Sequence, residues 1–198
     1  MNIDNLFQTL RQQTGQAHRN LEATYPFNQH MRSTSFNAQA YARSLHVLKA
    51  FHLAAVQPIA LLPAPITKLI DDEHVLSALN TDIAILPSNS DELPVFSIDN
   101  KNAPAETAIA FSYVWMGSSM GGSIISKWLQ KHHPELPVNY YLSMAGAGLQ
   151  WEAYKASALE YARETNVDVA VCAAEAVKVF EGIIQAASCY QADNSPSN

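Results

Sequence analysis

The hydrophobic positions near the start of the chain recur at the spacing of a helix. Leu6, Leu10, Ala17 and Leu21 are separated by four or seven residues, so they line one face of an α-helix. Pro26 follows them and cannot continue a helix, because it lacks a backbone N–H. The pattern therefore predicts an opening helix of about twenty residues that ends before Pro26.

Similar patterns predict two further helices and then an irregular stretch. Ser35 or Asn37 can cap a helix that ends near Pro58, because their side-chain oxygens accept hydrogen bonds from a first helical turn. The apolar residues of this helix are Tyr41, Leu45, Leu48, Phe51 and Leu53. A shorter helix is predicted over Ile66 to Leu79. The stretch from Asn80 to Pro104 mixes prolines with Asn, Ser and Asp residues, which predicts an irregular connection.

The second half of the chain also has a helical pattern. Residues Ala105 to Leu129 contain no proline and are predicted to form one long helix, which Pro134 and Pro137 stop. Two more helices are predicted over Gly148 to Glu164 and Val167 to Ser188. Because no alternating strand pattern occurs, these segments predict an all-α, single-domain, multi-helix bundle.

Composition and charge restrict the class of protein. Of 198 residues, 48% are hydrophobic and 15% are charged, as expected of one globular domain. We expect a helical domain over residues 1–189 and a flexible tail at 190–198. The net charge of −6 argues against a nucleic-acid partner, which would require a basic face. No apolar run is long enough to span a membrane, and the polar start lacks the pattern of a signal peptide, so we expect a cytoplasmic protein without a membrane partner.

Three glycines lie inside the long predicted helix. Gly117, Gly121 and Gly122 fall within six residues, and each costs about 0.5–1 kcal/mol relative to alanine. The run matches G-x-S-x-G, but no strand precedes it and no acid followed by a histidine comes after it, which argues against a nucleophile elbow. It lacks the Gly-Lys-Ser/Thr ending of a phosphate loop. Close helix packing explains one small pair, but explains the adjacent Gly121 and Gly122 poorly. The remaining interpretation is a bent helix whose bare backbone lies against a large planar ligand.

His18, on the opening helix, has neighbours suited to a ligand site. Arg11 lies seven residues earlier on nearly the same face, about 10 Å along the axis. That separation is close to the span between a haem iron and a propionate. Glu22 lies four residues after His18 and can orient the imidazole through its non-ligating nitrogen. The alternative is an exposed polar stripe that carries a His–Glu pair.

Two segments together resemble the bacterial haem oxygenase family. They are LRQQTGQAHRNLE near the start and SYVWMGSSMGGSIISKWL in the long helix. Their order and separation match that family, as does a later pattern, WEAYKASALE followed by AAEAVKVFEGII. The resemblance covers most of the chain. It implies a haem-oxygenase-like bundle with a kinked distal helix.

On one side of the implied haem site, the resemblance assigns residues to the iron and the propionates. His18 matches the proximal ligand of the haem iron, and Glu22 is expected to orient it. Arg11 matches a basic position that pairs with a propionate, which arginine can do bidentately, and Tyr113 matches a tyrosine that hydrogen-bonds a propionate. Further basic candidates are Lys127, Lys131 and Lys155. For each lysine, a solvated helix face is the simpler interpretation.

On the distal side, the resemblance assigns the glycine run. Gly117 and Gly121 match the glycines at the bend of the distal helix, and Gly122 matches the one beside them. Ser118 stands where mammalian members carry an aspartate that organises distal water. This departure leaves open which groups hold the water network.

The resemblance implies that the protein is a haem oxygenase, an oxidoreductase that converts haem, O2 and external electrons to biliverdin, carbon monoxide and iron. Haem would be both cofactor and substrate, with His18, Gly117, Ser118 and Gly121 at the reacting centre. A neutral histidine ligand and a distal wall without an acid or base suit attack on the ring. A separate reductase or ferredoxin is the expected electron donor, because the chain has no nucleotide or iron–sulfur motif. Two alternatives stay open: a non-catalytic haem-binding or trafficking protein, and a relative of the thiaminase-like helical proteins that binds another small molecule.

Overall fold

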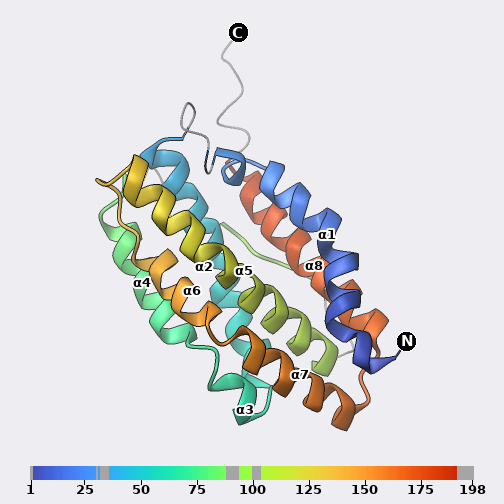
Figure 1. Ribbon diagram of the computed structural model, residues 1–198. Coiled ribbons are helices and arrows are strands. Elements are labelled where there is room, and N and C mark those ends of the chain that lie inside the picture. The colour runs from blue at the N-terminus through green and yellow to red at the C-terminus, as the bar shows by residue number, and fades with distance from the viewer. Residues whose placement is uncertain (1, 30, 32–35, 88–93, 100–103, 191–198) are drawn as a thin grey trace.

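The computed structural model describes residues 2–29, 31, 36–87, 94–99 and 104–190, and every regular element in these ranges is helical (Figure 1). In chain order the elements are η1 (Ile3–Asn5), α1 (Leu6–Ala23), η2 (Phe27–Gln29), α2 (Ala38–Ala60), α3 (Ala64–Thr67), α4 (Asp72–Ala84), α5 (Pro104–His132), α6 (Asn139–Gly148), α7 (Trp151–Thr165) and α8 (Val169–Ser188). The all-α prediction is therefore confirmed for the described residues. Among these helices, none combines the length and the hydrophobicity that a bilayer span requires.

Helix α5 runs through the middle of the bundle (Figure 1) and packs against α2, α6, α7 and α8. It begins at Pro104, whose missing N–H costs nothing in a first helical turn. Its buried residues include Phe111, Trp115 and Leu129, as expected for a helix with neighbours on several sides. The helix is continuous through its three glycines. The bend predicted at those glycines stays a prediction.

Helix α1 packs against α8 along most of its length (Figure 1). Leu6, Leu10 and Ala17 are buried, which confirms the helical spacing on which the opening helix was predicted. Helix α8 begins after Asp168, whose carboxylate accepts hydrogen bonds from the backbone N–H groups of Ala170 and Val171. This side-chain cap replaces hydrogen-bond partners that the first helical turn lacks.

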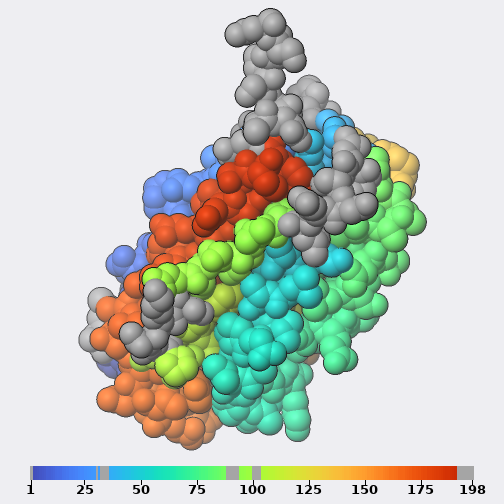
Figure 2. Space-filling view, turned by 180° about the vertical axis from the view of Figure 1, so that it is seen from behind, coloured from blue at the N-terminus to red at the C-terminus, as the bar shows by residue number. Residues whose placement is uncertain are grey.

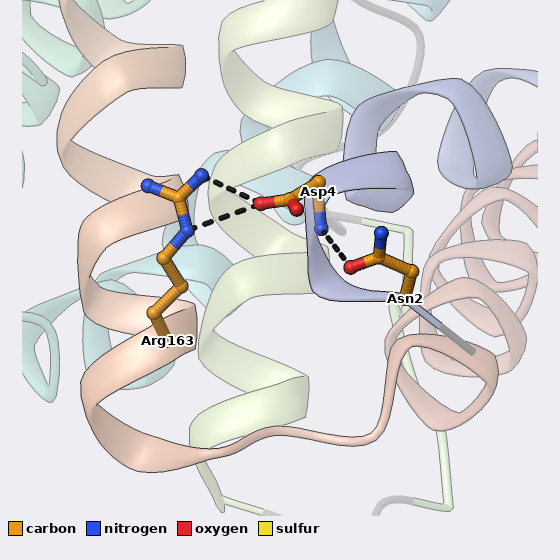
Figure 3. A network of polar contacts seen from close by, with 3 residues as sticks. All are labelled: Asn2, Asp4 and Arg163. Atoms are coloured by element: carbon orange, nitrogen blue, oxygen red, sulfur yellow. Dashed lines mark hydrogen bonds and ion pairs between the residues drawn. The ribbon is translucent and has the colours of Figure 1, made fainter.

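The start of the chain is held against α7 by an ion pair (Figure 3). Arg163 donates from Nη2 and Nε to Oδ1 of Asp4, at 2.6 and 3.2 Å. The backbone N–H of Asp4 donates to Oδ1 of Asn2 at 3.1 Å. The hydrogen bond from Arg163, and then its charge, hold the pKa of Asp4 below its ordinary value. Since both side chains are more than half exposed, the pair mainly fixes where α1 begins and adds little stability.

The second predicted helix is confirmed as α2. Oδ1 of Asn37 accepts a hydrogen bond from the backbone N–H of Ala40 at 2.8 Å, so Asn37 is the N-cap that the sequence suggested. Ser35, the other candidate, lies outside the described residues. Pro58 falls within the last turn of α2, so the helix ends slightly later than predicted.

The third predicted helix, Ile66 to Leu79, is wrong as a single element. Helix α3 ends at Thr67, and α4 begins after Asp71, whose Oδ1 accepts a hydrogen bond from the backbone N–H of His74 at 3.1 Å. An aspartate cap of this kind starts a new helix. Helix α4 then continues to Ala84, into the stretch that the sequence predicted to be irregular.

The sequence patterns missed α6 entirely. Val138 precedes the helix and supplies no side-chain cap. Instead, the carboxylate of Asp82 on α4 accepts hydrogen bonds from the backbone N–H groups of Asn139 and Tyr140, and from Nδ2 of Asn139 at 2.7 Å. Asp82 has no exposed surface and lies 57 residues before Asn139. Because this cap is remote in sequence, no local pattern could reveal it.

Residues 94–99 form an extended segment between α8 and α2 on the back of the molecule (Figure 2). Phe96 and Ile98 pack so closely over Gly182 that a Cβ atom there would lie 2.7–2.9 Å from their side chains. Nζ of Lys178 donates to the backbone oxygen of Asp99 at 3.1 Å. Part of the predicted irregular connection therefore has a fixed position, packed against α8.

The end of the described chain remains packed on the bundle. Tyr190, the first residue of the predicted tail, is buried, and the guanidinium of Arg43 lies 5.2 Å from the centre of its ring. The rest of that predicted tail, residues 191–198, lies outside the described residues.

His52 makes the stability of the fold depend on pH. Its side chain is fully buried on α2, where Nε2 lies 3.1 Å from the hydroxyl oxygen of Tyr140. Burial lowers the pKa of His52 to about 3 from an ordinary 6.5. Between pH 6.5 and 3, His52 therefore binds a proton in the unfolded chain but not in the native chain. The free energy of unfolding falls as the pH is lowered through this range.

We expect His52 to contribute about 1.4 kcal/mol of lost stability per pH unit below 6.5. Urea unfolding of the natural chain and of His52→Gln between pH 7 and 4.5 measures this contribution as the difference between their two slopes. Glutamine keeps a polar group near Tyr140 but has no proton to bind. Parallel slopes for the two proteins would show that His52 does not resist protonation.

Candidate functional site

Four residues of α1 lie on one face of the helix. Phe7, Arg11, Thr14 and His18 are three or four residues apart, which places them within about 60° around the helix axis. Arg11 and His18 are exposed, whereas Thr14 is buried. The Arg11–His18 face that the sequence predicted is therefore present on α1.

His18 is held by contacts on two sides of its ring. The ring meets Phe180 of α8 edge-on, with ring centres 5.6 Å apart. Nδ1 lies 3.6 Å from Oε1 of Glu22. Within the described part of the chain, no hydrogen bond or ion pair engages Nε2, and 54% of the side chain is exposed. A carboxylate beside one ring nitrogen and a free second nitrogen is the arrangement in which a histidine can bind a metal.

Tyr113 of α5 is the point at which α5 meets this face of α1. Its ring centre lies 6.3 Å from that of Phe7 and 6.2 Å from that of Trp151. Burial raises the pKa of Tyr113, while the neighbouring polar side chain of Thr14 and the positive charge of Arg11 oppose that shift. The positive charge of Arg11 therefore acts on Tyr113, and their role in holding carboxylates stays a prediction. Thr14 belongs to the same cluster and was missed.

Helices α1 and α5 run in the same direction and diverge towards their C-terminal ends (Figure 1). Phe7 contacts Tyr113 at the end where the two helices are close. His18 follows Phe7 by about three turns, and the run from Gly117 to Gly122 begins about one turn after Tyr113. The imidazole and the glycine run therefore both lie beyond this contact, towards the diverging ends of the two helices.

Gly117 and Gly121 lie on an open side of α5. A Cβ atom on Gly117 would meet nothing within 4 Å, and one on Gly121 would meet only the end of Ile125, at 3.7 Å. On the same side, Met120 is 54% exposed and Ile124 is 59% exposed. Packing inside the described protein therefore does not require glycine at either position. Close approach of a ligand to the helix backbone would explain glycine at both positions.

Gly122 lies on a different side of α5, against α6. A Cβ atom there would lie 2.7 Å from the backbone oxygen of Tyr141 and 2.7 Å from the backbone nitrogen of Ala145. Close approach of two helix backbones therefore explains Gly122 without a ligand. The three glycines, which the sequence grouped as one feature, serve two separate surfaces.

Ser118 is exposed, and its hydroxyl donates to the backbone oxygen of Trp115 at 2.7 Å. A serine hydroxyl carries one proton, so towards the outside this side chain offers only acceptor lone pairs. The proton of Ser118 is therefore committed within α5.

Of the three lysines that the sequence suggested, Lys155 lies nearest to this cluster. Its Nζ is 5.8 Å from the centre of the Trp151 ring, which contacts Tyr113, and 2.9 Å from Oε1 of Glu152. Lys127 and Lys131 are exposed on the C-terminal part of α5. Lys127 and Lys131 therefore fit the simpler interpretation, in which a lysine lies on a solvated helix face. Lys155 instead lies on the side of the Trp151 and Tyr113 rings.

Comparison of the chain with protein-family models, with curated proteins and with solved structures gave no match. What the site can do chemically is thus set by its own groups. It offers one histidine nitrogen, one guanidinium and one phenol around an exposed apolar surface. Such a set suits a large, partly apolar ligand that carries a metal and carboxylates.

A groove of about 770 Å³ lies elsewhere, between α4 and α6. Nε2 of His74 and Oγ of Ser143 lie 3.1 Å apart across it, and its floor includes Val75 and Ala78. Sequence reasoning missed this groove because it missed α6. The groove shares no lining residue with the His18 face.

Proposed function

We propose that the chain is a haem oxygenase, which converts haem with O2 and external electrons to biliverdin, carbon monoxide and iron. One observation carries the proposal. His18 has a carboxylate beside Nδ1 and a free Nε2, on the helix face that carries Arg11 and contacts Tyr113 through Phe7. This face thus offers one nitrogen that can bind a metal and, in Arg11 and Tyr113, two groups that can hold carboxylates. The resemblance of the sequence to bacterial haem oxygenases supports the same assignment.

The chain's own residues would hold the substrate from three directions. His18 would bind the iron through Nε2, while Glu22 and Phe180 fix the ring by its other nitrogen and its edge. Arg11 and Tyr113 would hold the propionates. Gly117 and Gly121 would leave bare backbone on the distal side, with Met120 and Ile124 as apolar cover.

The distal residues would also keep proton donors away from the reacting centre. Gly117 and Gly121 have no side chain, and the proton of Ser118 is used within α5. Bound haem supplies an iron centre that activates O2 and a meso carbon that is oxidised. An environment without an acidic side chain favours oxidation of the ring over the O–O cleavage that an acid promotes.

The test begins with an absorption titration of the purified protein with hemin. A Soret band that saturates at one hemin per chain supports the site. Ascorbate is then added in the presence of catalase, which removes free peroxide. Decay of the Soret band with growth of a biliverdin-like band supports an oxygenase, whereas a stable haem complex would identify a haem-binding or trafficking protein. Absence of a Soret complex would exclude both.

Gly117→Ala and Gly121→Ala separate a functional reason for these glycines from a structural one. Neither Cβ atom meets an obstacle, so each change should stabilise the fold by about 0.5–1 kcal/mol. Each should nevertheless slow haem conversion, since the new methyl group faces the proposed ligand. Urea unfolding and single-turnover absorption measure the two effects.

Gly146→Ala is the matched control for this pair. Gly146 lies in α6, and a Cβ atom there also meets nothing within 4 Å, so the fold should gain similar stability. Its haem conversion should equal that of the natural chain. If Gly117→Ala and Gly121→Ala also convert haem at the natural rate, the open side of α5 is not the distal wall.

A further inference from the structure

The groove between α4 and α6, which lie side by side (Figure 1), holds a histidine and a serine that face one another. Nε2 of His74 on α4 lies 3.1 Å from Oγ of Ser143 on α6. Oδ1 of Asp71 accepts a hydrogen bond from the backbone N–H of His74 at 3.1 Å and so fixes the turn that carries the imidazole. The groove volume of about 770 Å³ falls within the range of about 300–1,000 Å³ that is typical of small-molecule sites. The pair therefore lies where a small ligand can reach it.

The hydroxyl of Ser143 differs from most serine hydroxyls in the helices of this protein. A helical serine often donates its proton to a carbonyl in the preceding turn of its own helix. The serines that do so here are Ser44, Ser112, Ser118, Ser119, Ser126 and Ser188. In the described chain, Ser143 instead has its hydrogen bond with His74. When the ring proton of His74 is on Nδ1, Nε2 is an acceptor, and the proton of Ser143 points at it.

Asn139 adds an N–H donor beside this pair. It precedes Ser143 by four residues, so the two side chains are neighbours on one side of α6, and both residues line the groove. Nδ2 of Asn139 donates to Oδ1 of Asp82 at 2.7 Å, and Asp82 has no exposed surface. A side-chain amide carries two N–H protons. One of them holds the amide in place, and the described residues provide no partner for the other.

We propose that the groove is a second site, which hydrolyses carboxylic esters with Ser143 as nucleophile and His74 as general base. Oγ of Ser143 bonds to the ester carbonyl carbon as its proton passes to Nε2 of His74. The carbonyl oxygen takes the electron pair and is stabilised by the unpartnered N–H of Asn139. The C–O bond to the alcohol then breaks, and the alcohol leaves with the proton that His74 holds. Water next attacks the acyl group and gives its proton to His74, which returns it to Ser143 as the acid departs.

The walls of the groove favour an ester with an apolar acyl chain. Val75 and Ala78 are buried at its floor, and Leu69 and Leu142 also line it. Leu142 is 48% exposed, so it presents apolar surface that an acyl chain can cover. Because the groove shares no lining residue with the His18 face, the reaction needs no haem and the inference does not rest on the proposed function.

Covalent labelling of the natural chain tests the nucleophile. A fluorophosphonate forms a P–O bond with an activated serine and releases fluoride. We expect one label per chain, located on Ser143 by peptide mass spectrometry and absent from Ser143→Ala. His74→Gln should also stay unlabelled, because glutamine can keep a hydrogen bond to Ser143 but cannot take its proton. Ser188→Ala is the matched control, since the hydroxyl of Ser188 is committed within α8, and it should be labelled like the natural chain.

Hydrolysis of p-nitrophenyl butyrate measures the activity. A positioned base contributes about 10²–10⁴-fold, so Ser143→Ala and His74→Gln should each lower the rate about a hundredfold or more. Circular dichroism checks that both variants are folded, and both should still bind hemin as the natural chain does. A natural chain that takes no label and hydrolyses the ester no faster than Ser143→Ala would overturn the proposal. Labelling that persists in His74→Gln would overturn it as well.

Discussion

His18→Ala should remove the normal hemin complex, with a shifted Soret band and affinity reduced about a hundredfold or more. Loss of a group that merely orients a metal ligand typically costs about 10–100-fold, so loss of the ligand itself should exceed what Glu22→Gln costs. The structure leaves Nε2 of His18 without a partner in the described chain and places Glu22 at Nδ1. Hemin titrations of the natural chain, His18→Ala and Glu22→Gln give the three affinities.

His74→Ala is the matched control for this loss. His74 is also an exposed helical histidine with a polar neighbour, Ser143, but it lies on α4 and away from α1. Its hemin complex should be unchanged. Added imidazole should restore a normal Soret band to His18→Ala by filling the vacated ligand position. If His18→Ala binds hemin with an unaltered spectrum, another residue is the ligand and the site has been misassigned.

Gly122→Ala should destabilise the fold by about 1–3 kcal/mol, the range for overpacking in a well-packed interior. The added Cβ would lie 2.7 Å from backbone atoms of Tyr141 and Ala145. Backbone atoms of a packed helix cannot turn aside as a flexible side chain can, so α5 and α6 must separate. Urea unfolding at pH 7 measures the change.

The neighbouring glycine provides the contrast. Gly121→Ala adds the same methyl group one residue earlier, where only the end of Ile125 lies within reach, and should stabilise the fold. Opposite signs at adjacent positions would confirm that the glycine run serves two surfaces. Equal signs would show that Gly121 and Gly122 share one environment and that the α5–α6 contact is looser than described.

The broad fold could be predicted because its determinants are local. Helical spacing, an Asn37 cap and prolines beyond the helix ends are features of neighbouring residues, and they located α1, α2 and α5 well. Helix α6 could not be located in this way. Its cap is Asp82, which reaches it only after the chain has folded.

The candidate site was predictable in part for the same reason. The spacing of Arg11, His18 and Glu22 places them on one side of any helix, and the structure keeps them there. The contact of Tyr113 with Phe7 could be found only from the relation between two helices. Thr14 did offer a signal, since it lies three residues after Arg11 and four before His18. The glycines could not be divided by sequence, because nothing local shows that Gly122 faces α6.

The central claim is that this protein opens haem at the site between α1 and α5, and a single-turnover reaction with product identification tests it most directly. The hemin complex is reduced under O2 with catalase present, and the products are analysed by absorption and mass spectrometry. We predict one biliverdin and one carbon monoxide per haem, with both products lost in His18→Ala. Haem recovered intact from the natural chain, or the same bilin yield from His18→Ala, would contradict the claim.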